Sequence, residues 1–243
     1  SGVELMFYRN QDILRRTTNL LQKPNGFFAL LKTADNIISL TEAPFYGKKI
    51  DREIRFKDDA VTYIARTEEI ETELSAHISR SAACEVKTIR LENRKNQSKE
   101  AELLIYLEPA LALQSDDAAH LAFSKLFIEI KKQAESNIVV ARRKTRMGEN
   151  SLYLAVGFAE DMAFEIESNR ENVLRSPQGI FSLPEAFDAN FSSKSSGVPD
   201  PCIALRVKFH LSQRGKTVFH FILSVGQTFQ QAIDGVIGSR LSI

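Results

Sequence analysis

The chain has 243 residues, 43% of them hydrophobic, and its 32 lysines and arginines nearly balance its 31 aspartates and glutamates. This length is enough for one large or two small domains with a hydrophobic core. A net charge of +1, with basic residues scattered among acidic ones, argues against nucleic acid as a partner. No apolar run approaches the roughly 18 residues of a membrane-spanning helix, so we expect neither a membrane protein nor an exported one.

The cysteines indicate the cellular compartment of the chain, and its first residues indicate whether it is a fragment. Cys84 and Cys202 lie far apart, with no CxxC spacing and no cysteine–histidine cluster. This pattern argues against a thiolate zinc site and against a disulfide framework, and it favours a reducing cytoplasm. The chain begins Ser1-Gly2-Val3 with no methionine, which favours an excised fragment of a longer protein.

Apolar residues alternate with polar ones through most of the chain, as expected for antiparallel strands with one buried face. The alternation is clearest over residues 51–79. Two β-hairpins are predicted where polar, turn-favouring tracts separate β-rich runs, namely 86–91 with 103–107 and 203–211 with 217–225. Further strands are expected at 125–130, 138–143, 152–158 and 162–166. About a dozen strands with few helices predict an all-β protein built as a large antiparallel double sheet.

Two segments depart from the strand pattern. Thr228-Phe229-Gln230-Gln231 has the spacing of a capping box, and the apolar residues that follow form one helical stripe, so a helix should begin near residue 228. We therefore divide the chain into a β domain at 1–227 and a helical segment at 228–243. The serine-rich stretch 184–201 has little periodicity and predicts a long loop.

A search for catalytic motifs finds none. The chain lacks GxSxG, HExxH, GxGxxG and a phosphate-binding glycine loop, which are minimal parts of hydrolase, zincin and nucleotide sites. His77, His210 and His220 fall inside strand patterns and are expected to pack on the sheets. His120 differs because it follows two aspartates in a polar connection.

Three polar clusters are the candidates for a site. Asp117, His120 and Lys125 lie in a segment expected to be a loop that leads into a strand, and such loops are well placed to meet a ligand. Arg142 and Arg143 end a predicted strand, where arginine can bind carboxylate or phosphate. Arg170 belongs to a third polar stretch. The alternative is structural: Asp117 and His120 bond to their own loop, Phe123 and Phe127 fill the core, and the arginines form a solvated rim.

These clusters carry a family resemblance. The segments Asp117-Ala118-Ala119-His120, Ala122-Phe123-Ser124-Lys125-Leu126-Phe127, Ala141-Arg142-Arg143 and Asp200-Pro201-Cys202 resemble the N-terminal β-supersandwich domain of glycoside hydrolase family 94, formerly glycosyltransferase family 36. The likeness is closest to the branch of cyclic β-1,2-glucan synthases and 1,2-β-oligoglucan phosphorylases, and it extends to cellobiose phosphorylases. It covers residues 8–236, and the first strand or two of the domain would precede Ser1.

The resemblance implies a galactose mutarotase-like supersandwich that precedes a helical linker and an (α/α)6 barrel, with residues 228–243 as the start of the linker helix. In that family the barrel holds the aspartate that acts as general acid, and inorganic phosphate is the attacking substrate. The chain alone is thus expected to be inactive, to need no cofactor or metal, and to support the cleft for a β-glucan oligosaccharide. Its partners would be its own barrel domain and a second copy in a homodimer. We expect Asp117, His120, Lys125, Arg142, Arg143 and Arg170 at the cleft or at the domain interface.

Two other functions remain open. A free-standing carbohydrate-binding module would need aromatic platforms, yet the chain has no tryptophan and only five tyrosines. An aldose epimerase would need two imidazoles and an acid in one cleft, and His210 and His220 could approach each other if their predicted strands are paired.

Overall fold

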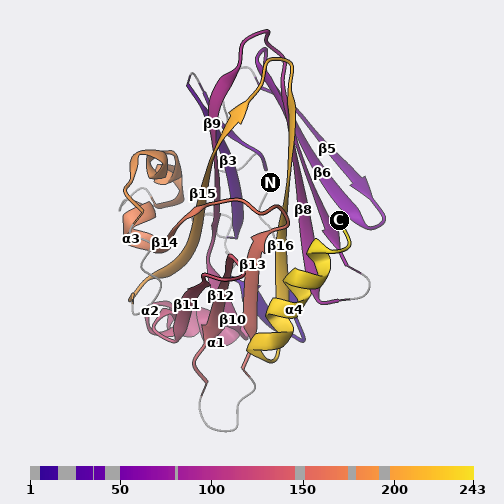
Figure 1. Cartoon of the computed structure of the whole chain (residues 1–243). Coiled ribbons are helices and arrows are strands. Elements are labelled where there is room, and N and C mark those ends of the chain that lie inside the picture. The colour runs from indigo at the N-terminus through magenta and orange to yellow at the C-terminus, as the bar shows by residue number, and fades with distance from the viewer. Residues whose placement is uncertain are drawn as a thin grey trace.

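The computed structural model describes residues 6–15, 26–34, 36–41, 50–79, 82–145, 151–174, 179–191 and 198–243. The elements are arranged as antiparallel sheets flanked by short helices (Figure 1). In chain order they are β1 (Phe7–Tyr8), β2 (Gln11–Leu14), β3 (Phe27–Thr33), β4 (Ile37–Ser39), β5 (Asp51–Lys57), β6 (Ala60–Arg66), β7 (Ile70–Ile78), β8 (Cys84–Asn93), β9 (Lys99–Leu107), β10 (Pro109–Ala112), α1 (Gln114–Ala119), α2 (Leu121–Lys125), β11 (Ile128–Gln133), β12 (Ile138–Arg143), β13 (Tyr153–Phe158), β14 (Glu165–Asn169), α3 (Arg170–Val173), η1 (Gly179–Asp188), β15 (Pro201–Leu211), β16 (Lys216–Gly226) and α4 (Phe229–Arg240).

Two large sheets face each other and enclose the main core. One has the strand order β11-β12-β13-β16-β8-β7-β6-β5 and the other β14-β15-β9-β3-β4. Alternate residues of each strand point into the space between the sheets, for example Ile89 on β8, Phe221 on β16 and Ile105 on β9. A small sheet, β1-β2-β10, adds Ile13 and Leu111 to this core. The prediction of an all-β double sheet is therefore confirmed.

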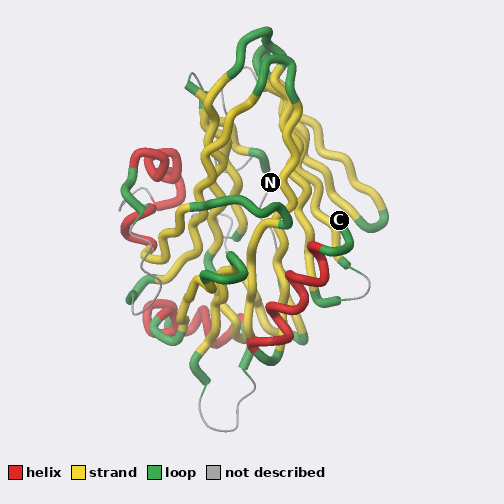
Figure 2. Tube along the Cα trace, viewed as in Figure 1, coloured by secondary structure: helices red, strands yellow, loops and turns green. Residues whose placement is uncertain are grey.

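Helices cover the outer faces of both large sheets (Figure 2). The 3-10 helix η1 and α3 pack on the five-stranded sheet, where Leu183 and Val173 meet Leu104 and Tyr106. Helix α4 packs on the eight-stranded sheet, where Val236 meets Ile222 and its neighbours. Strands buried on both faces lose their alternation and read as continuous apolar runs, as β9 and β16 do at their carboxyl ends.

The two predicted hairpins are wrong in their pairing. The strand ranges were expected, but β8 lies in the eight-stranded sheet and β9 in the five-stranded one, and β15 and β16 are divided in the same way. Each polar tract therefore crosses between the layers. A hydrogen-bonded side chain joins the two crossing segments. Asn93 Nδ2 donates to the Gln97 carbonyl of the first crossing at 2.7 Å and to the Ser212 carbonyl of the second at 3.0 Å. Alternation reveals which face of a strand is buried, and it does not reveal the neighbouring strand.

The C-terminal helix is confirmed, and it docks on the sheet. The Thr228 side chain accepts the amide of Gln231 at 3.2 Å, as the capping spacing predicts. Ala232, Ile233 and Val236 from the predicted stripe are buried, whereas Phe229 is 39% exposed. The role of residues 228–243 as a linker stays a prediction.

The long loop expected at 184–201 is partly wrong. Residues 179–188 form the 3-10 helix η1, and residues 192–197, which include all four serines of the stretch, lie outside the described residues. The sequence pattern does not reveal this helix, because a 3-10 helix repeats every three residues, unlike an α-helix or a strand, and because Pro184 interrupts the pattern. Two strands also begin later than expected, β11 at Ile128 and β14 at Glu165.

Both cysteines are buried and free. Burial raises the pKa of the Cys202 thiol well above its ordinary value, so this thiol is protonated. Among the described residues, no helix has the length and apolar character needed to cross a membrane.

Candidate functional site

The polar clusters meet at the end of the sandwich where β2, β10, β12 and the helices α1 and α2 come together. The segment expected to be a loop leading into a strand is instead this pair of short helices, joined at His120. Residues 114–125 are mostly alanines and polar residues, and most of them face away from the core. The sequence therefore shows no apolar stripe that would predict these helices. The buried exceptions are Asp117 and Ser124.

Asp117 forms a two-pronged ion pair with a residue that the sequence did not single out. Arg15 donates from Nε to Oδ2 at 2.8 Å and from a terminal nitrogen to Oδ1 at 3.0 Å. Ser124 Oγ donates to Oδ1 at 2.6 Å, and Arg143 donates to the same Ser124 Oγ at 3.0 Å. Burial raises the pKa of Asp117, but the hydrogen bonds and charge of Arg15 outweigh this effect and hold the pKa below its ordinary value.

Glu108 is the second buried carboxylate, and it links Arg15 to Arg170. Arg15 reaches its Oε2 at 3.4 Å, whereas Arg170 Nε and the Tyr106 hydroxyl donate to its Oε1 at 2.8 Å and 2.5 Å. Burial alone would raise the pKa of Glu108. The charges of Arg170 and Arg15 and the Tyr106 hydrogen bond outweigh burial, so the pKa is lowered and Glu108 is ionised.

Asp200 extends these contacts to the surface. Its Oδ1 lies 2.5 Å from Lys125 Nζ, and its Oδ2 lies 3.5 Å from a terminal nitrogen of Arg170. The backbone amide of Arg170 also donates to the Asp200 carbonyl at 2.8 Å. We call the connected set the arginine–carboxylate network, made of Arg15, Tyr106, Glu108, Asp117, Ser124, Lys125, Arg143, Arg170 and Asp200.

Four of the six predicted site residues belong to this network, and two do not. Asp117, Lys125, Arg143 and Arg170 are brought together from four elements. Arg142 points to the other face of β12, where Nε donates to Glu129 Oε2 at 2.6 Å on the exposed surface. His120 is exposed at the junction of α1 and α2 and lies outside the network. The network contradicts the structural alternative for Asp117, whose partners come mostly from distant parts of the chain.

Sequence reasoning missed Arg15, Glu108 and Tyr106. Arg15 follows three buried residues of β2 and is itself only 2% exposed. In the sequence two arginines, Arg15 and Arg16, follow the apolar pair Ile13-Leu14, which is typical of the end of a strand, so no pattern marks Arg15 as buried. Glu108 lies between the apolar runs of β9 and β10, and that position is the one available signal of a buried acid.

A pocket of about 520 Å³ opens beside the network. His120, Asp116, Phe123, Phe127 and Arg143 are among its lining residues. The Phe123 and Phe127 rings meet edge to face with their centroids 5.0 Å apart, and the Arg143 guanidinium lies 5.4 Å from the centre of the Phe127 ring.

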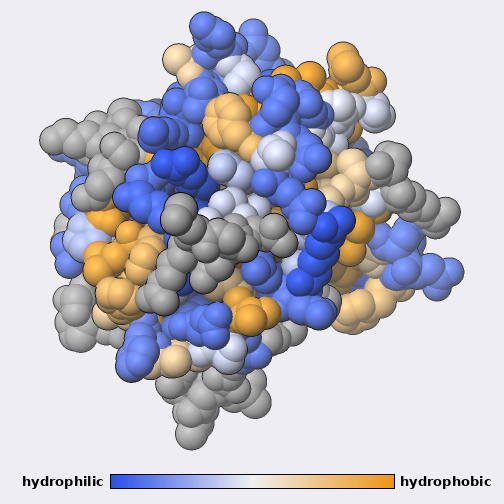
Figure 3. Space-filling view, turned by 90° about the horizontal axis from the view of Figure 1, so that it is seen from below, coloured by the Kyte–Doolittle hydropathy of each residue, from blue (hydrophilic) through white to orange (hydrophobic). Residues whose placement is uncertain are grey.

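Apolar side chains surround this pocket on the molecular surface. The most exposed on the two helices and at their ends are Leu113 at 44%, Leu121 at 42%, Phe123 at 56% and Leu126 at 53%. We call these four residues the α1–α2 apolar patch. Figure 3 views the molecule from this end and shows apolar groups interspersed with charged ones. Four large apolar side chains are thus exposed around one short helix pair.

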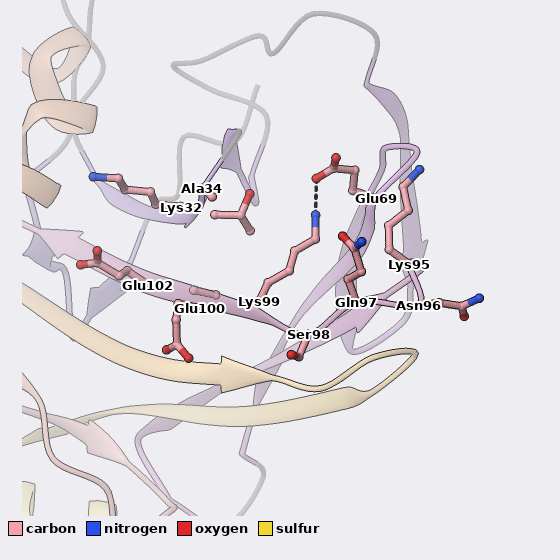
Figure 4. A pocket seen from close by; sticks show the side chains of 12 residues that line it. Lys32, Ala34, Glu69, Lys95, Asn96, Gln97, Ser98, Lys99, Glu100 and Glu102 are labelled. Carbon is pink, nitrogen blue, oxygen red and sulfur yellow. Dashed lines mark hydrogen bonds and ion pairs between the residues drawn. The ribbon is translucent and has the colours of Figure 1, made fainter.

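A larger, open cleft of about 840 Å³ lies at the opposite end, near the turn between β8 and β9. Its lining is dominated by charged and amide side chains, and Lys99 Nζ pairs with Glu69 Oε2 at 2.5 Å across it (Figure 4). Glu102 Oε2 is buried there without a hydrogen-bond partner and lies 3.9 Å from Arg206 Nε. The lining includes no aromatic ring that could stack on a sugar.

The geometry restricts the chemistry of these sites. A general acid needs a raised pKa, whereas Glu108 and Asp117 have lowered pKa values and are saturated by arginine. Within the described ranges, no group of three or more His, Cys, Asp or Glu side chains is arranged to bind a metal ion.

The prediction that His210 and His220 lie on paired strands, as an epimerase site would need, is wrong. His210 and His220 lie on β15 and β16, which belong to different sheets and are not paired. His210 Nδ1 is 2.8 Å from Glu100 Oε1, and His220 Nδ1 is 2.7 Å from Glu160 Oε1. Each imidazole thus contacts a different glutamate, and the two rings do not share a site.

Comparison with known proteins identifies relatives of the whole β domain. The sequence profile of the family described as "Glycosyl hydrolase 94, supersandwich domain" matches residues 1–237. The cyclic beta-(1,2)-glucan synthase NdvB of Rhizobium meliloti (strain 1021) is 22% identical over 245 residues, which cover 98% of this chain. The chain spans only 9% of that relative.

Solved structures share the fold. A bacterial glucoamylase complexed with acarbose superposes with a TM-score of 0.58 at 11% identity, over 95% of this chain and 29% of the glucoamylase. A polysaccharide lyase gives a TM-score of 0.51 at 15% identity, over 99% of this chain and 34% of the lyase. At these identities the likeness shows the fold alone.

Proposed function

Because the chain belongs to the glycosyl hydrolase 94 family of supersandwich domains, we propose that it is the non-catalytic domain of a protein that acts on β-glucans. The observation that carries the proposal is the arginine–carboxylate network. Its two buried acids, Glu108 and Asp117, are both committed to ion pairs with arginines of the chain itself. The chain then contributes a rigid wall and a docking surface, and the proton donor and the phosphate site belong to another domain.

The α1–α2 apolar patch is the surface through which the chain would dock. The network lies directly beneath it, because Asp117 and Ser124 of these helices bind Arg15 and Arg143 of the sandwich. This attachment fixes the patch relative to both sheets, so a partner that covers it is held in a defined orientation. The resemblance to glycoside hydrolase family 94 makes an (α/α)6 barrel domain the expected partner.

The gene and its products test this function. We expect a helical-barrel domain to be encoded in the same reading frame or an adjacent one, and its purified form to bind the chain in isothermal titration calorimetry. Leu126→Ser and Phe123→Ser should weaken that binding by at least about tenfold, since each removes an exposed apolar side chain that the barrel domain would bury. Phe181→Ser is the matched control, because Phe181 is equally exposed at 51% but lies on η1.

Activity assays provide the second test. The chain alone, given β-1,2-glucan with and without inorganic phosphate, should release neither glucose nor a sugar phosphate. Turnover by the isolated chain, or full binding of the barrel domain by the Phe123 and Leu126 variants, would overturn the proposal.

A carbohydrate-binding module remains a second candidate because of the open cleft near the β8–β9 turn. Glu102, whose Oε2 makes no hydrogen bond in the structure, and the lysines and amides of the cleft offer acceptors and donors for sugar hydroxyls. Calorimetric titration with β-1,2-glucan oligosaccharides tests this function. Micromolar binding that Glu102→Gln weakens would favour the module, and no binding at millimolar sugar would eliminate it.

A further inference from the structure

A small pocket lies on the outer face of the eight-stranded sheet, beside the first residue of α4. Its volume is about 170 Å³, and its lining includes Glu129, Lys131, Val140, Arg142, Tyr153 and Phe229. Helix α4 packs on β12, β13 and β16 at this place (Figure 1). None of these residues belongs to the α1–α2 apolar patch or to the arginine–carboxylate network.

Strand pairing places five of these side chains on one face of the sheet. Arg142 of β12 lies opposite Glu129 of β11 on one side and Tyr153 of β13 on the other. Two residues earlier on β12, Val140 lies opposite Lys131. Cross-strand partners, and residues two apart on a strand, share a face, and Val140 belongs to the apolar cluster that α4 covers. The fold therefore gathers an aromatic ring, an acid and two cations around one apolar floor.

Two aromatic rings form a corner of this pocket. The Tyr153 and Phe229 rings meet edge to face, with their centroids 6.4 Å apart and their planes at 82°. Phe229 stays 39% exposed although α4 is docked on the sheet, whereas Val140 between the rims is only 4% exposed. The C–H groups on one face of a sugar ring can pack on such aromatic surfaces. The small volume admits a single hexose unit.

The charges around the pocket favour a negative ligand. Arg142 Nε donates to Glu129 Oε2 at 2.6 Å, and Lys144 Nζ lies 2.8 Å from Glu129 Oε1, so two cations share one carboxylate. The hydrogen bond from Lys144, aided by that from Arg142, lowers the pKa of Glu129 and keeps it ionised. Lys131 is exposed, and within the described ranges it has no ion-pair partner. This group thus carries an excess of positive charge, which attracts an anion.

We propose that this pocket binds an anionic hexose, a single sugar unit that carries a phosphate or a carboxylate group. The sugar ring packs in the corner of Tyr153 and Phe229, and the anionic group meets Lys131 at the rim. The choice of a sugar ring rests on the proposed function, whereas the aromatic corner and the excess of positive charge are independent of it. A ligand of this size at an open site should dissociate at about 0.1–1 mM.

Titration of the full chain with small probes tests the proposal. The probes are glucose 1-phosphate, glucuronate, glucose and inorganic phosphate, and backbone amide shifts of nitrogen-15-labelled protein report where each one binds. At least one anionic hexose should shift the amides of residues 129–131, 140–142 and 153. It should bind at least about tenfold more tightly than glucose or phosphate alone. The tighter of the two anionic hexoses identifies the anionic group as phosphate or carboxylate.

Two substitutions separate the parts of the site. Lys131→Gln should weaken binding of the anionic hexose at least about fivefold, because it removes the charge at the rim. Phe229→Ala should weaken it by a similar factor, because it removes one ring of the corner. Lys216→Gln is the matched control, since Lys216 is also an exposed strand lysine but pairs with Glu92 on β8, and it should leave binding unchanged. The amide spectra show whether each variant is folded.

The proposal is wrong if neither anionic hexose shifts these amides at about 10 mM, if phosphate alone binds as tightly as the sugars, or if Lys131→Gln binds as tightly as the wild type. These outcomes are separate from the docking test, because Lys131 and Phe229 lie outside the α1–α2 apolar patch. A barrel domain that fails to bind would contradict the proposed function and leave this titration unaffected. A failed titration would leave the docking test unaffected.

Discussion

Arg15 and Asp117 lie 102 positions apart in the chain and form a buried, two-pronged ion pair. Arg15 directly follows β2, and Asp117 is part of α1, so this pair ties the end of the small sheet to the helices that carry the apolar patch. The same guanidinium also reaches Glu108, which in turn binds Arg170 at the start of α3. Through Glu108, Arg15 is therefore connected to a segment in the second half of the chain.

Replacing Arg15 should therefore cost much of the stability of the fold. Arg15→Met removes the partner of two buried carboxylates, and breaking a buried pair in this way costs about 3–5 kcal/mol. Urea unfolding followed by circular dichroism measures the change in the free energy of unfolding. A loss below about 1 kcal/mol would show that the two acids find other partners on relaxation.

Arg142→Met is the matched control for this change. Arg142 also binds a carboxylate, that of Glu129, but its side chain is 46% exposed. An exposed pair contributes about 0–1 kcal/mol. The double variant Arg15→Met/Asp117→Leu should be more stable than Arg15→Met alone, because it removes the unpaired charge together with its partner.

The network also predicts how stability depends on pH. The pKa values of Glu108 and Asp117 are lower in the folded chain than in the unfolded chain, where such groups titrate near pH 4. Their contribution is thus complete above the unfolded values and is lost as the pH falls through the folded ones. The urea midpoint should fall as the pH is lowered from about 5 to about 3.

Asp117→Asn isolates part of this effect. The variant should be less stable at pH 7 and should lose less stability than the wild type on acidification, because one depressed carboxyl is gone. Asp116→Asn is the control, since Asp116 is the exposed neighbour on the same helix and its carboxylate accepts a bond from Ser115. Parallel pH curves for the wild type and Asp117→Asn would contradict the assignment.

Asn93 should be the residue on which the two layer crossings depend. It is 1% exposed, its amide nitrogen donates to two carbonyls, and its Oδ1 accepts the amide of Lys95 at 3.0 Å. Asn93→Ala leaves these buried groups without a partner, which costs about 1–3 kcal/mol. Thermal unfolding measures the loss.

Asn96→Ala provides the comparison within the same turn. Asn96 accepts a bond from Arg214 Nε, but this contact is exposed, so we expect a change within about 0.5 kcal/mol. Equal losses in the two variants would mean that burial of the Asn93 amide does not determine the stability of the crossings.

The sequence predicted faces of strands far better than it predicted partners of residues. The alternation over residues 51–79 agrees with the burial of Ile70, Thr72 and Leu74 on one face of β7, because alternation reports the side of a strand that is buried. Alternation carries no information on the order of strands in a sheet. The sequence therefore predicts that the strands on either side of residues 93–99 pair with each other, whereas the structure places them in different sheets.

The same limit applies to the site. Asp117, Lys125, Arg143 and Arg170 stood out because they are polar residues in unusual local patterns. Their shared partners, Arg15 and Glu108, come from segments whose local pattern is ordinary. Only the folded arrangement shows that Arg15 is buried between two acids, because burial of a charge depends on partners that are distant in the sequence.

Two glycines of α4 offer a test of how firmly this helix is docked on the sheet. A Cβ added at Gly235 would lie 2.1 Å from Ser224 Oγ and 2.9 Å from Cys84 Sγ, both on strands beneath the helix. Because these atoms belong to a packed sheet, Gly235→Ala should destabilise the chain by about 1–3 kcal/mol. At Gly238 an added Cβ meets no atom within 4 Å, so Gly238→Ala should stabilise the helix by about 0.5–1 kcal/mol.

Opposite signs for these two substitutions are the expected result in urea unfolding. Both replace glycine by alanine in the same helix, so their helix propensities cancel in the comparison and the difference reports the contact with the sheet. Hydrogen exchange should also become faster in α4 of Gly235→Ala, since a helix lifted from Ile222 loses the burial that protects its amides. Stabilisation by both substitutions would mean that α4 does not rest against β8 and β16 in solution, and residues 228–243 would then be free to act as the linker that the sequence predicts.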